Sequence, residues 1–430
     1  MIDTLNSNQR NFFSEISIAD VINISQTGDI LTTSNEKLDR NDDSVFRNFD
    51  AYKKAYFSPW VQGKVKLSIK DVIKYFNPDK KIYAENFSLR SQDWFNELKE
   101  NANLESIGIL NLKAMIVNNT SLRNLPTIKP GFYDPRLPGE GFPFDNIQES
   151  LLHIGEPVII SHFTKDKSFA LVETNTKNFG FVQTNDLSLI DSGLATKILT
   201  HDFGMTSLDN VNLYLKNITL LYLNTINLGT LLPIKTDKDS SYDILLPTKG
   251  NDGWLTFKTV NVHKSTFIKS PLSFTPTNTA KLIDRLIDKP YGWGGYLQNR
   301  DCAQLLKDYF ALFGIHMPIF SGDQIKVGNY ISLENKLNAE KLDIIKNKAK
   351  PFKTLLYRKG HVTLFLGKYN NQYIMFHSVW GVHLYDSQDT EYRYIIGKSI
   401  ISTLEYGKEL KNYTNKSSFL HLLSGMTTIE

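Results

Sequence analysis

Hydrophobic and polar positions follow two different periods along this chain. Three segments place apolar residues three to four positions apart, which predicts helices over residues 68–76, 91–103 and 279–289. Ser91 directly precedes the apolar positions of the second segment and is a predicted helix N-cap. The first fifty residues are instead rich in Asn, Asp and Ser, as in "TTSNEKLDRNDDS", and predict a loop or a loosely packed arm.

Short runs rich in Val, Ile, Phe and Thr, separated by turn residues, begin near residue 106. They fall into two sets, over residues 106–195 and 196–270, and each set predicts a small β-barrel. The two sets show no convincing repeat at the level of residues. The first set is interrupted by the Gly- and Pro-rich insert "IKPGFYDPRLPGEGFPFD", and ordered loops of this length are often functional.

The last part of the chain mixes helical and strand patterns. From about residue 271, helical segments lead into strands such as "HVTLFLGKY" and "QYIMFHSVW", which predicts an α+β domain. The predicted organisation is therefore multidomain α+β: a partly helical N-terminal arm, two small β-barrels and a C-terminal α+β domain. The predicted boundaries are 1–105, 106–195, 196–270 and 271–430.

Composition narrows the class of protein. Hydrophobic residues make up 41% of the chain and charged residues 22%, which argues against wholesale disorder. The net charge is +4, but Lys and Arg are scattered, so nucleic-acid binding is not expected. No apolar run approaches the roughly 20 residues of a membrane helix. The first residues lack a signal-peptide pattern, so we expect a cytosolic protein or one whose export signal was removed.

Cys302 is the only cysteine of the chain. The sequence after it places apolar residues on one helical face: Leu305, Leu306, Tyr309, Phe310 and Phe313. Gly314 is a natural residue to follow that helix. Cys302 would thus lie at a helix N-terminus, where the free N–H groups favour the nucleophilic thiolate. The flexible "YGWGG" just upstream can bring backbone N–H groups close to a substrate carbonyl.

A nucleophilic cysteine needs a base, and His361, His377 and His383 follow downstream. His361 and His377 lie on two runs joined by "KYNNQ", so an antiparallel hairpin would bring their imidazoles together. The histidines lack the His-Glu-x-x-His spacing of a zinc site, and we expect neither metal nor cofactor. On these residues alone, an inert cysteine and structural histidines remain an open alternative.

These residues resemble a known family. "YGWGG…NRDCAQLLKDYFALFGIHMPIFSGDQ" and "GHVTLFLG…FHSVWG" are similar to the NlpC family of bacterial cysteine peptidases, which have a papain-like α+β fold. "SLRNLPT…GEGFPFDNIQESLLHIGEPVIISH" resembles the first of two bacterial SH3-like barrels in a multidomain branch of that family. "YAENF…WFNELKENAN" resembles the N-terminal stabilising segment of that branch. The resemblance covers most of the chain beyond about residue 55.

The resemblance implies roles for individual residues. Cys302 matches the nucleophile, His361 the general base and His377 the orienting third residue. The implied substrate-binding residues are Asp301 for the α-amine of L-alanine, Tyr291 and Trp293 as an aromatic pair, Ser321 for the glutamyl part, and Glu156 as the first barrel's contribution.

The sequence also departs from the family pattern. Ala303 stands where the family usually has a serine that hydrogen-bonds substrate. Phe179 stands where some relatives have a site tyrosine, and it cannot make that hydroxyl contact. We interpret His316, which replaces an aromatic residue, as structural.

The implied activity is hydrolysis of peptidoglycan stem peptides between γ-D-glutamate and the following diamino acid, with a free N-terminal L-alanine. The expected partners are therefore stem peptides or muropeptides, and we expect a monomer in the periplasm or cell envelope. Two other functions stay open. One is an inactive peptidoglycan-binding scaffold, and the other is an amidase or acyltransferase on the same core.

Overall fold

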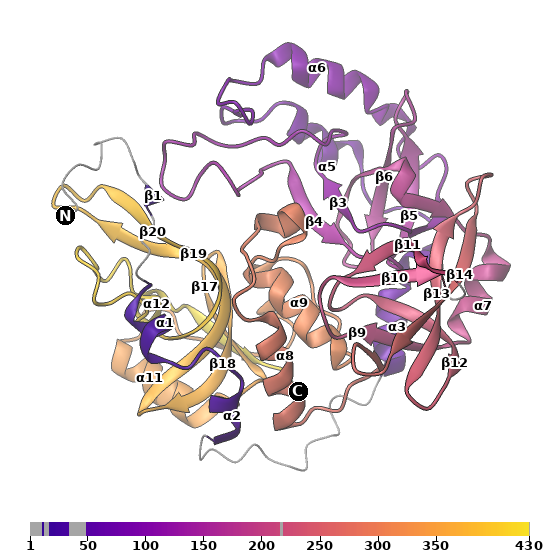
Figure 1. The fold of residues 1–430 in the computed structure, drawn as a ribbon. Coiled ribbons are helices and arrows are strands. Elements are labelled where there is room, and N and C mark those ends of the chain that lie inside the picture. Colours follow the sequence, from indigo (N-terminus) through magenta and orange to yellow (C-terminus); the bar gives the residue numbers. More distant parts are fainter. Residues whose placement is uncertain (1–10, 13–16, 34–48, 216–217, 430) are drawn as a thin grey trace.

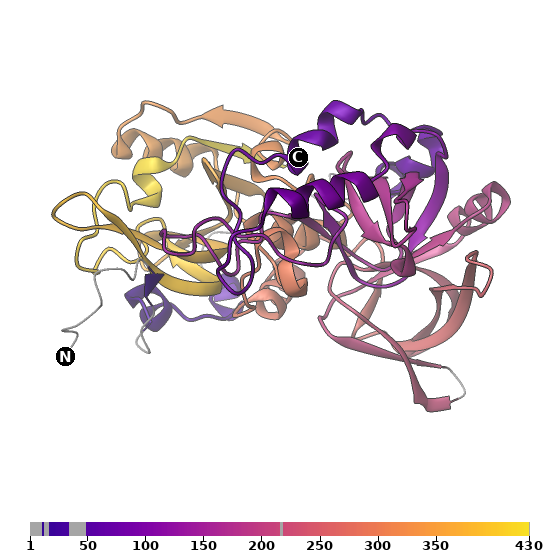
Figure 2. The same cartoon turned by 90° about the horizontal axis from the view of Figure 1, so that it is seen from above.

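The computed structural model of the chain describes residues 11–12, 17–33, 49–215 and 218–429. Two smaller β domains lie on one side of the molecule, and the C-terminal α+β domain lies on the other (Figures 1 and 2). Within the described residues, no helix is long and apolar enough to cross a membrane. The boundaries between the domains stay predictions.

The first β domain is a seven-stranded antiparallel sheet in the order β4-β3-β7-β6-β5-β2-β8. Its strands are β2 (Leu112–Ile116), β3 (Thr120–Arg123), β4 (Gln148–Leu152), β5 (Pro157–Phe163), β6 (Phe169–Thr174), β7 (Phe179–Gln183) and β8 (Leu187–Leu189). Small and β-branched residues such as Ala114, Ile160 and Val172 fill its interior. The Gly- and Pro-rich insert forms the long connection between β3 and β4.

Short helices cover one side of this first β domain. They are α5 (Ile69–Ile73), the 3-10 turns η1 (Lys74–Phe76) and η2 (Leu104–Ser106), and α6 (Gln92–Asn101). Ser91 caps α6 as predicted, because its hydroxyl oxygen accepts the Trp94 N–H at 3.1 Å. Phe76 and Phe95 pack with Phe181 of β7 in one apolar cluster, which attaches these helices to the sheet.

The second β domain has a five-stranded antiparallel sheet in the order β14-β13-β12-β9-β15. Its strands are β9 (Asp202–Thr206), β12 (Leu231–Asp237), β13 (Ser241–Lys249), β14 (Leu255–His263) and β15 (Phe267–Lys269). A separate hairpin, β10 (Val211–Leu215) with β11 (Ile218–Ile226), accompanies it, and α7 (Ser192–Leu199) connects the two β domains.

The C-terminal domain is built on a seven-stranded sheet in the order β1-β20-β19-β18-β17-β21-β16. Its strands are β16 (Asn329–Ser332), β17 (Thr354–Arg358), β18 (His361–Tyr369), β19 (Gln372–Tyr385), β20 (Glu391–Thr403) and β21 (Gly425–Thr428), with the N-terminal β1 (Asn11–Phe12) at one edge. Its helices are α8 (Pro276–Leu286), η4 (Trp293–Gln298), α9 (Cys302–Leu312), α10 (Ser321–Gln324), α11 (Asn338–Lys348) and α12 (Phe419–Leu422).

The helix α9 lies in the centre of this domain's hydrophobic core. Every residue of α9 except Lys307 is buried. Tyr309 and Phe310 of α9 share an apolar cluster with Leu364 of β18, while the neighbouring Phe365 points into a second cluster with Phe419 of α12. Successive β18 residues thus face opposite layers, and the strand is buried on both sides.

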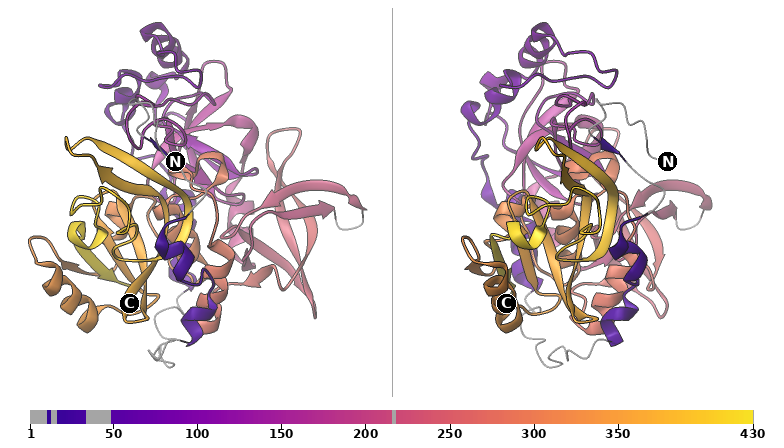
Figure 3. Two further views of the ribbon diagram at one scale, coloured as in Figure 1. Left: turned by 60° about the vertical axis from the view of Figure 1, so that its left-hand side comes forward. Right: turned by 90° about the vertical axis from the view of Figure 1, so that its left-hand side faces the viewer.

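The prediction of a loose arm over the first fifty residues is wrong where the structure describes it. Residues 17–33 form α1 (Ala19–Asn23) and α2 (Asp29–Thr33), which lie along the C-terminal domain (Figure 3). The Gln26 amide exchanges two 2.9 Å hydrogen bonds with the backbone of Ile401 in β20. Further along, α3 (Phe49–Tyr56) and α4 (Ser58–Gln62) pack into the core between domains. The rest of that prediction, 1–10, 13–16 and 34–48, lies outside the described residues.

Candidate active site

Cys302 is the first residue of α9, as the sequence predicts, and Asp301 is its N-cap. Asp301 Oδ1 accepts the N–H groups of Ala303 and Gln304 at 3.0 and 2.8 Å, and its Oδ2 accepts the Gly294 N–H at 2.9 Å. The carboxylate therefore holds the helix start and the Gly-rich turn together. Across the described part of the chain, the Cys302 N–H makes no hydrogen bond, so it is a first-turn donor left for another group.

The Cys302 side chain lies against the start of β18. It shares an apolar cluster with Val362 and Leu364, and the Val362 N–H lies within hydrogen-bonding reach of the sulfur. His361, the residue before Val362, opens the strand. Cys302 and His361 are each 7% exposed, so both functional groups are nearly removed from water.

The predicted hairpin between β18 and β19 is present, and it joins the two histidines directly. His361 Nε2 and His377 Nδ1 are 2.8 Å apart, and His377 Nε2 lies 2.9 Å from the Ser402 hydroxyl oxygen on β20. Tyr406 packs edge-on against the His377 ring, with ring centroids 5.1 Å apart. Sequence reasoning missed Ser402, because no spacing rule relates a β20 serine to a β19 histidine.

This chain of hydrogen bonds fixes where each proton lies. The Ser402 hydroxyl donates to the Thr403 carbonyl oxygen at 3.1 Å, so its oxygen accepts the His377 Nε2–H. His377 Nδ1 is then an acceptor, and it takes the Nε2–H of His361. The unprotonated nitrogen of His361 is therefore Nδ1, the atom able to accept a proton.

The resting charge state differs from the sequence prediction. Burial raises the pKa of the Cys302 thiol to about 12, and the adjacent Asp301 carboxylate adds to this rise. Burial also lowers the pKa of His361 well below 6.5, and the nearby His377 and Arg358 lower it further. The expected thiolate is thus wrong for the resting protein, because desolvation and Asp301 outweigh the helix N-terminus. The resting pair is a neutral thiol and a neutral imidazole.

An aromatic group lies beside the nucleophile. Burial raises the pKa of the Tyr291 hydroxyl, and the charges of Asp301 and then Cys302, both close to it, act in the same direction. Phe144, from the long loop of the first β domain, packs against three rings at centroid distances of 5.6 to 5.8 Å: Tyr291, Trp293 and Trp380. The loop predicted to be functional therefore contributes to the wall of the site.

Arg300, directly before the Asp301 cap, is a buried anchor that sequence reasoning missed. Its Nε donates to Asp308 at 2.6 Å, and its two Nη atoms donate to Asp209 of the second β domain at 2.7 Å each. Asp308 also contacts His153 of the first β domain at 3.2 Å. Burial alone would raise the pKa of Asp308, but Arg300 and His153 outweigh it and lower that pKa to about 2. One ion-pair network thus fixes the nucleophile's loop to both β domains.

Two further predicted site residues come from other elements of the fold. Ser321 opens α10, which rests on the first turn of α9 because Gln324 donates to the Ala303 carbonyl oxygen at 2.8 Å. Glu156 is buried elsewhere, where its carboxylate accepts the Lys307 ammonium at 3.3 Å and the His153 N–H at 3.1 Å.

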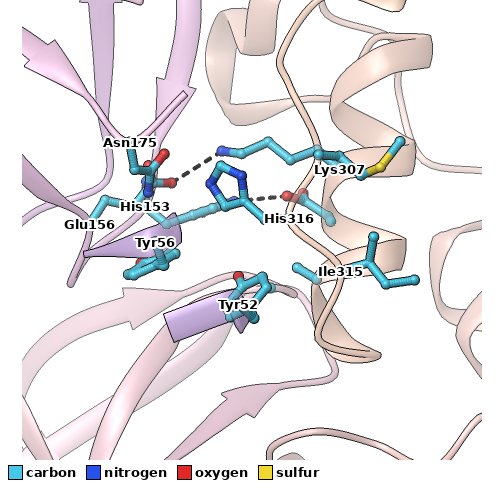
Figure 4. A pocket seen from close by; sticks show the side chains of 12 residues that line it. Tyr52, Tyr56, His153, Glu156, Asn175, Lys307, Ile315 and His316 are labelled. Atoms are coloured by element: carbon cyan, nitrogen blue, oxygen red, sulfur yellow. Dashed lines mark hydrogen bonds and ion pairs between the residues drawn. The ribbon is translucent and has the colours of Figure 1, made fainter. Parts of the chain in front are cut away.

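Glu156 lines a cavity at the junction of the domains, together with Tyr52, Tyr56, Asn175, Lys307 and His316 (Figure 4). Neither Cys302 nor His361 lines this cavity. The structure therefore does not bring Glu156 to the nucleophile, and its ion pair with Lys307 leaves it a structural role. His316, interpreted as structural, lies beside Tyr52 in the same cavity.

Family models match three parts of the chain. Residues 6–106 match the N-terminal stabilising domain of NLPC_P60 proteins, residues 130–183 match an SH3 domain of the SH3b1 type, and residues 288–395 match the NlpC/P60 family. The SH3 model covers the part of the first β domain from β4 to β7, and none of these three models extends over the second. No curated protein matches the chain significantly.

Comparison with solved structures found chains that are similar to different degrees. An NlpC/P60 endopeptidase from Photobacterium damselae subsp. piscicida is 25% identical, with a TM-score of 0.85 over 97% of this chain and 99% of that chain. An NlpC/P60 family protein from Bacillus cereus is 16% identical, with a TM-score of 0.49 over 74% of this chain and 99% of that chain. With SH3-like β structure preceding an α+β domain that carries the Cys302–His361–His377 arrangement, this chain contains an NlpC/P60 family domain over residues 288–395.

Proposed function

We propose that this protein is a cysteine endopeptidase that cleaves peptidoglycan stem peptides between γ-D-glutamate and the following diamino acid. The observation that carries the proposal is Cys302 at the start of α9, beside a strand whose His361 is held by His377 at 2.8 Å. The similarity to an NlpC/P60 endopeptidase over nearly the whole of both chains supports the same class of reaction.

Because the resting Cys302 thiol and His361 imidazole are both neutral, the first step of the proposed reaction includes a proton transfer. As the Cys302 sulfur attacks the γ-glutamyl carbonyl carbon, its proton passes to His361 Nδ1. His377 accepts the Nε2–H of the imidazolium that forms and so keeps the ring oriented. Proton transfer thus accompanies attack, because a preformed thiolate would be unstable in this buried site.

The later steps use the remaining groups of the site. In this proposal, the free Cys302 N–H donates to the oxyanion of the tetrahedral intermediate, and the buried Tyr291 hydroxyl is a second donor. His361 returns its proton to the leaving amine, and a thioester with the glutamyl carbon remains. Water, deprotonated by His361, then hydrolyses this thioester and releases the glutamyl product.

Substrate binding follows from the walls of the site. Asp301 is the proposed partner of the free L-alanine ammonium. Burial raises the pKa of Asp301, but three backbone N–H groups donate to its carboxylate and favour the charged form. Trp293, Phe144 and Ser321 complete the proposed walls. Such a substrate places the enzyme in the periplasm or cell envelope, which is part of the proposal.

The test uses purified L-Ala-γ-D-Glu-diaminopimelate tripeptide and mass spectrometry of the products. We expect release of L-Ala-D-Glu by the protein and none by Cys302→Ala, which keeps the fold because alanine fits the buried site. Tight binding of the tripeptide without turnover would instead favour a wall-binding scaffold. Cleavage of a different acyl bond would favour an amidase or acyltransferase.

A further inference from the structure

Arg358 lies directly opposite the proposed catalytic base. It ends β17, and its Cα is paired with that of His361 across the two strands. Side chains of directly paired residues lie on the same face of a sheet, about 5 Å apart at their Cβ atoms. The Arg358 guanidinium therefore stands on the His361 side of the sheet, next to the reacting groups.

The partners of Arg358 are neutral. Its Nη2 lies 3.3 Å from His383 Nε2, and His383 Nδ1 lies 2.9 Å from the Glu391 carboxylate. Burial lowers the pKa of His383 to about 4, so this ring is uncharged at neutral pH. Its Nδ1–H donates to Glu391, and its Nε2 accepts from the guanidinium. Arg358 is held in place by two neutral partners, His383 and the Tyr406 hydroxyl, and neither forms an ion pair with it.

Most other arginines of the described chain are paired with carboxylates, whereas Arg285 donates to the Ser207 and Ser265 carbonyl oxygens. Arg123 pairs with Asp145 at 2.5 Å, Arg393 with Glu391 at 2.8 Å, and Arg300 with two aspartates. For Arg358, no carboxylate of the described residues lies within ion-pair distance, and its enclosed Nε has no hydrogen-bond partner.

A partly buried cation without a directly paired carboxylate is costly, because its charge is only partly compensated by solvent and by the more distant Glu391. The charge of Arg358 also reaches Cys302, His361 and His377, whose pKa values it lowers. The Arg358 guanidinium is thus held beside the groups that would attack an acyl group, and its Nε–H has no acceptor. A guanidinium of this kind suits a carboxylate, which it can bind through two parallel hydrogen bonds.

We propose that Arg358 binds the free α-carboxylate of the glutamyl residue whose γ-carbonyl is attacked by Cys302. This inference rests on the proposed function, since it names the acidic group that the site recognises. In a γ-linked glutamate, the α-carboxylate belongs to the same residue as the attacked carbon and so stays close to it. Arg358 then selects an acidic glutamyl residue over one whose α-carboxylate is amidated.

The experiment compares two peptides that differ only at that group: L-Ala-γ-D-Glu-diaminopimelate and its α-carboxamide, L-Ala-γ-D-isoglutaminyl-diaminopimelate. We expect the unmodified protein to prefer the carboxylate in kcat/KM by about 10- to 100-fold. In Arg358→Gln this preference should fall below about threefold, and Arg358→Lys should keep part of it. Lys359→Gln, which removes an exposed positive charge one residue along, is the matched control and should keep the full preference.

Equal losses on both peptides in Arg358→Gln would overturn the inference, since Arg358 would then only position the histidines. A second measurement separates this result from failure of the proposed function. Calorimetry of Cys302→Ala with L-Ala-D-Glu and L-Ala-D-isoglutamine reports recognition without turnover. A preference for the acid that disappears in Cys302→Ala/Arg358→Gln supports the carboxylate site even if no peptide is cleaved, and equal binding of both ligands overturns it.

Discussion

Replacing Ser402 by alanine tests whether the hydrogen-bond chain behind His361 controls its protonation. Ser402 acts on the histidines by accepting the Nε2–H of His377 at 2.9 Å, and its own hydroxyl donates to the Thr403 carbonyl oxygen. His377 is fully buried, so the substitution leaves a donor without an acceptor and without water. We expect the free energy of unfolding to fall by about 1–3 kcal/mol because of that unsatisfied donor.

Loss of the Ser402 acceptor also affects catalysis, because it changes the relative stability of the two His377 tautomers. When Nε2 of His377 has no acceptor, the tautomer with a proton on Nδ1 becomes competitive, and it presents a donor to His361. His361 must then carry its own proton on Nδ1, where it cannot accept the thiol proton. Since each 1.4 kcal/mol is a factor of ten, we expect kcat to fall about 10- to 100-fold. KM should change less than about twofold, because Ser402 makes no substrate contact.

The assay is steady-state cleavage of the tripeptide, with nitrogen NMR of labelled histidine to report the tautomers. Ser402→Thr restores a hydroxyl and should recover most of kcat. The matched control is Ser188→Ala, which removes a buried hydroxyl from the first β domain, where it donates to the Gly253 carbonyl oxygen at 3.3 Å. An unchanged kcat in Ser402→Ala, or an equal loss in Ser188→Ala, would refute the reasoning.

Three other outcomes follow from the buried site. Because burial raises the pKa of Cys302 to about 12, its alkylation by iodoacetamide should still accelerate above about pH 10, and a plateau near pH 8 would contradict this. Burial lowers the pKa of His377 to about 3, against about 6.5 in the unfolded chain, so the unfolded state binds a proton first as pH falls. His377 should therefore contribute a drop of about 2 kcal/mol in the free energy of unfolding between pH 7 and 5, measured in urea titrations as the difference between the unmodified protein and His377→Gln. Asp20→Ala removes both hydrogen bonds to Thr403 and should lower stability by about 1–3 kcal/mol and also kcat, as thermal unfolding and the peptide assay would show.

The features that depend on local sequence pattern could be predicted. The apolar stripe after Cys302 places it at a helix start, and the structure has α9 there. The runs around His361 and His377 are short, continuous and mostly apolar, which is typical of buried strands, and a short turn between them leaves little choice but a hairpin. In both cases, the information lies within about twenty residues of the chain.

Features that depend on burial or on distant pairing could not be predicted. The resting thiol follows from how deeply α9 is packed, which no local pattern reports. Arg358 and Ser402 become site residues only through the register of β17 and β20 against their neighbours. The helices α1 and α2 have five residues each, too short to be stable alone, so their sequence carried no helical signal. They form because the C-terminal domain supplies their partners.

The contacts of α1 with β20 also link the N-terminal segment to the proposed proton transfer at His361. Asp20 Oδ2 accepts the backbone N–H of Thr403 at 2.6 Å and its hydroxyl at 2.8 Å. The Thr403 carbonyl oxygen in turn accepts the Ser402 hydroxyl, whose oxygen orients His377. Displacing α1 would free the end of β20 and so loosen the acceptor on which the histidine tautomers depend. Docking of α1 and proton transfer at His361 are therefore not independent, since both use the same two residues of one strand.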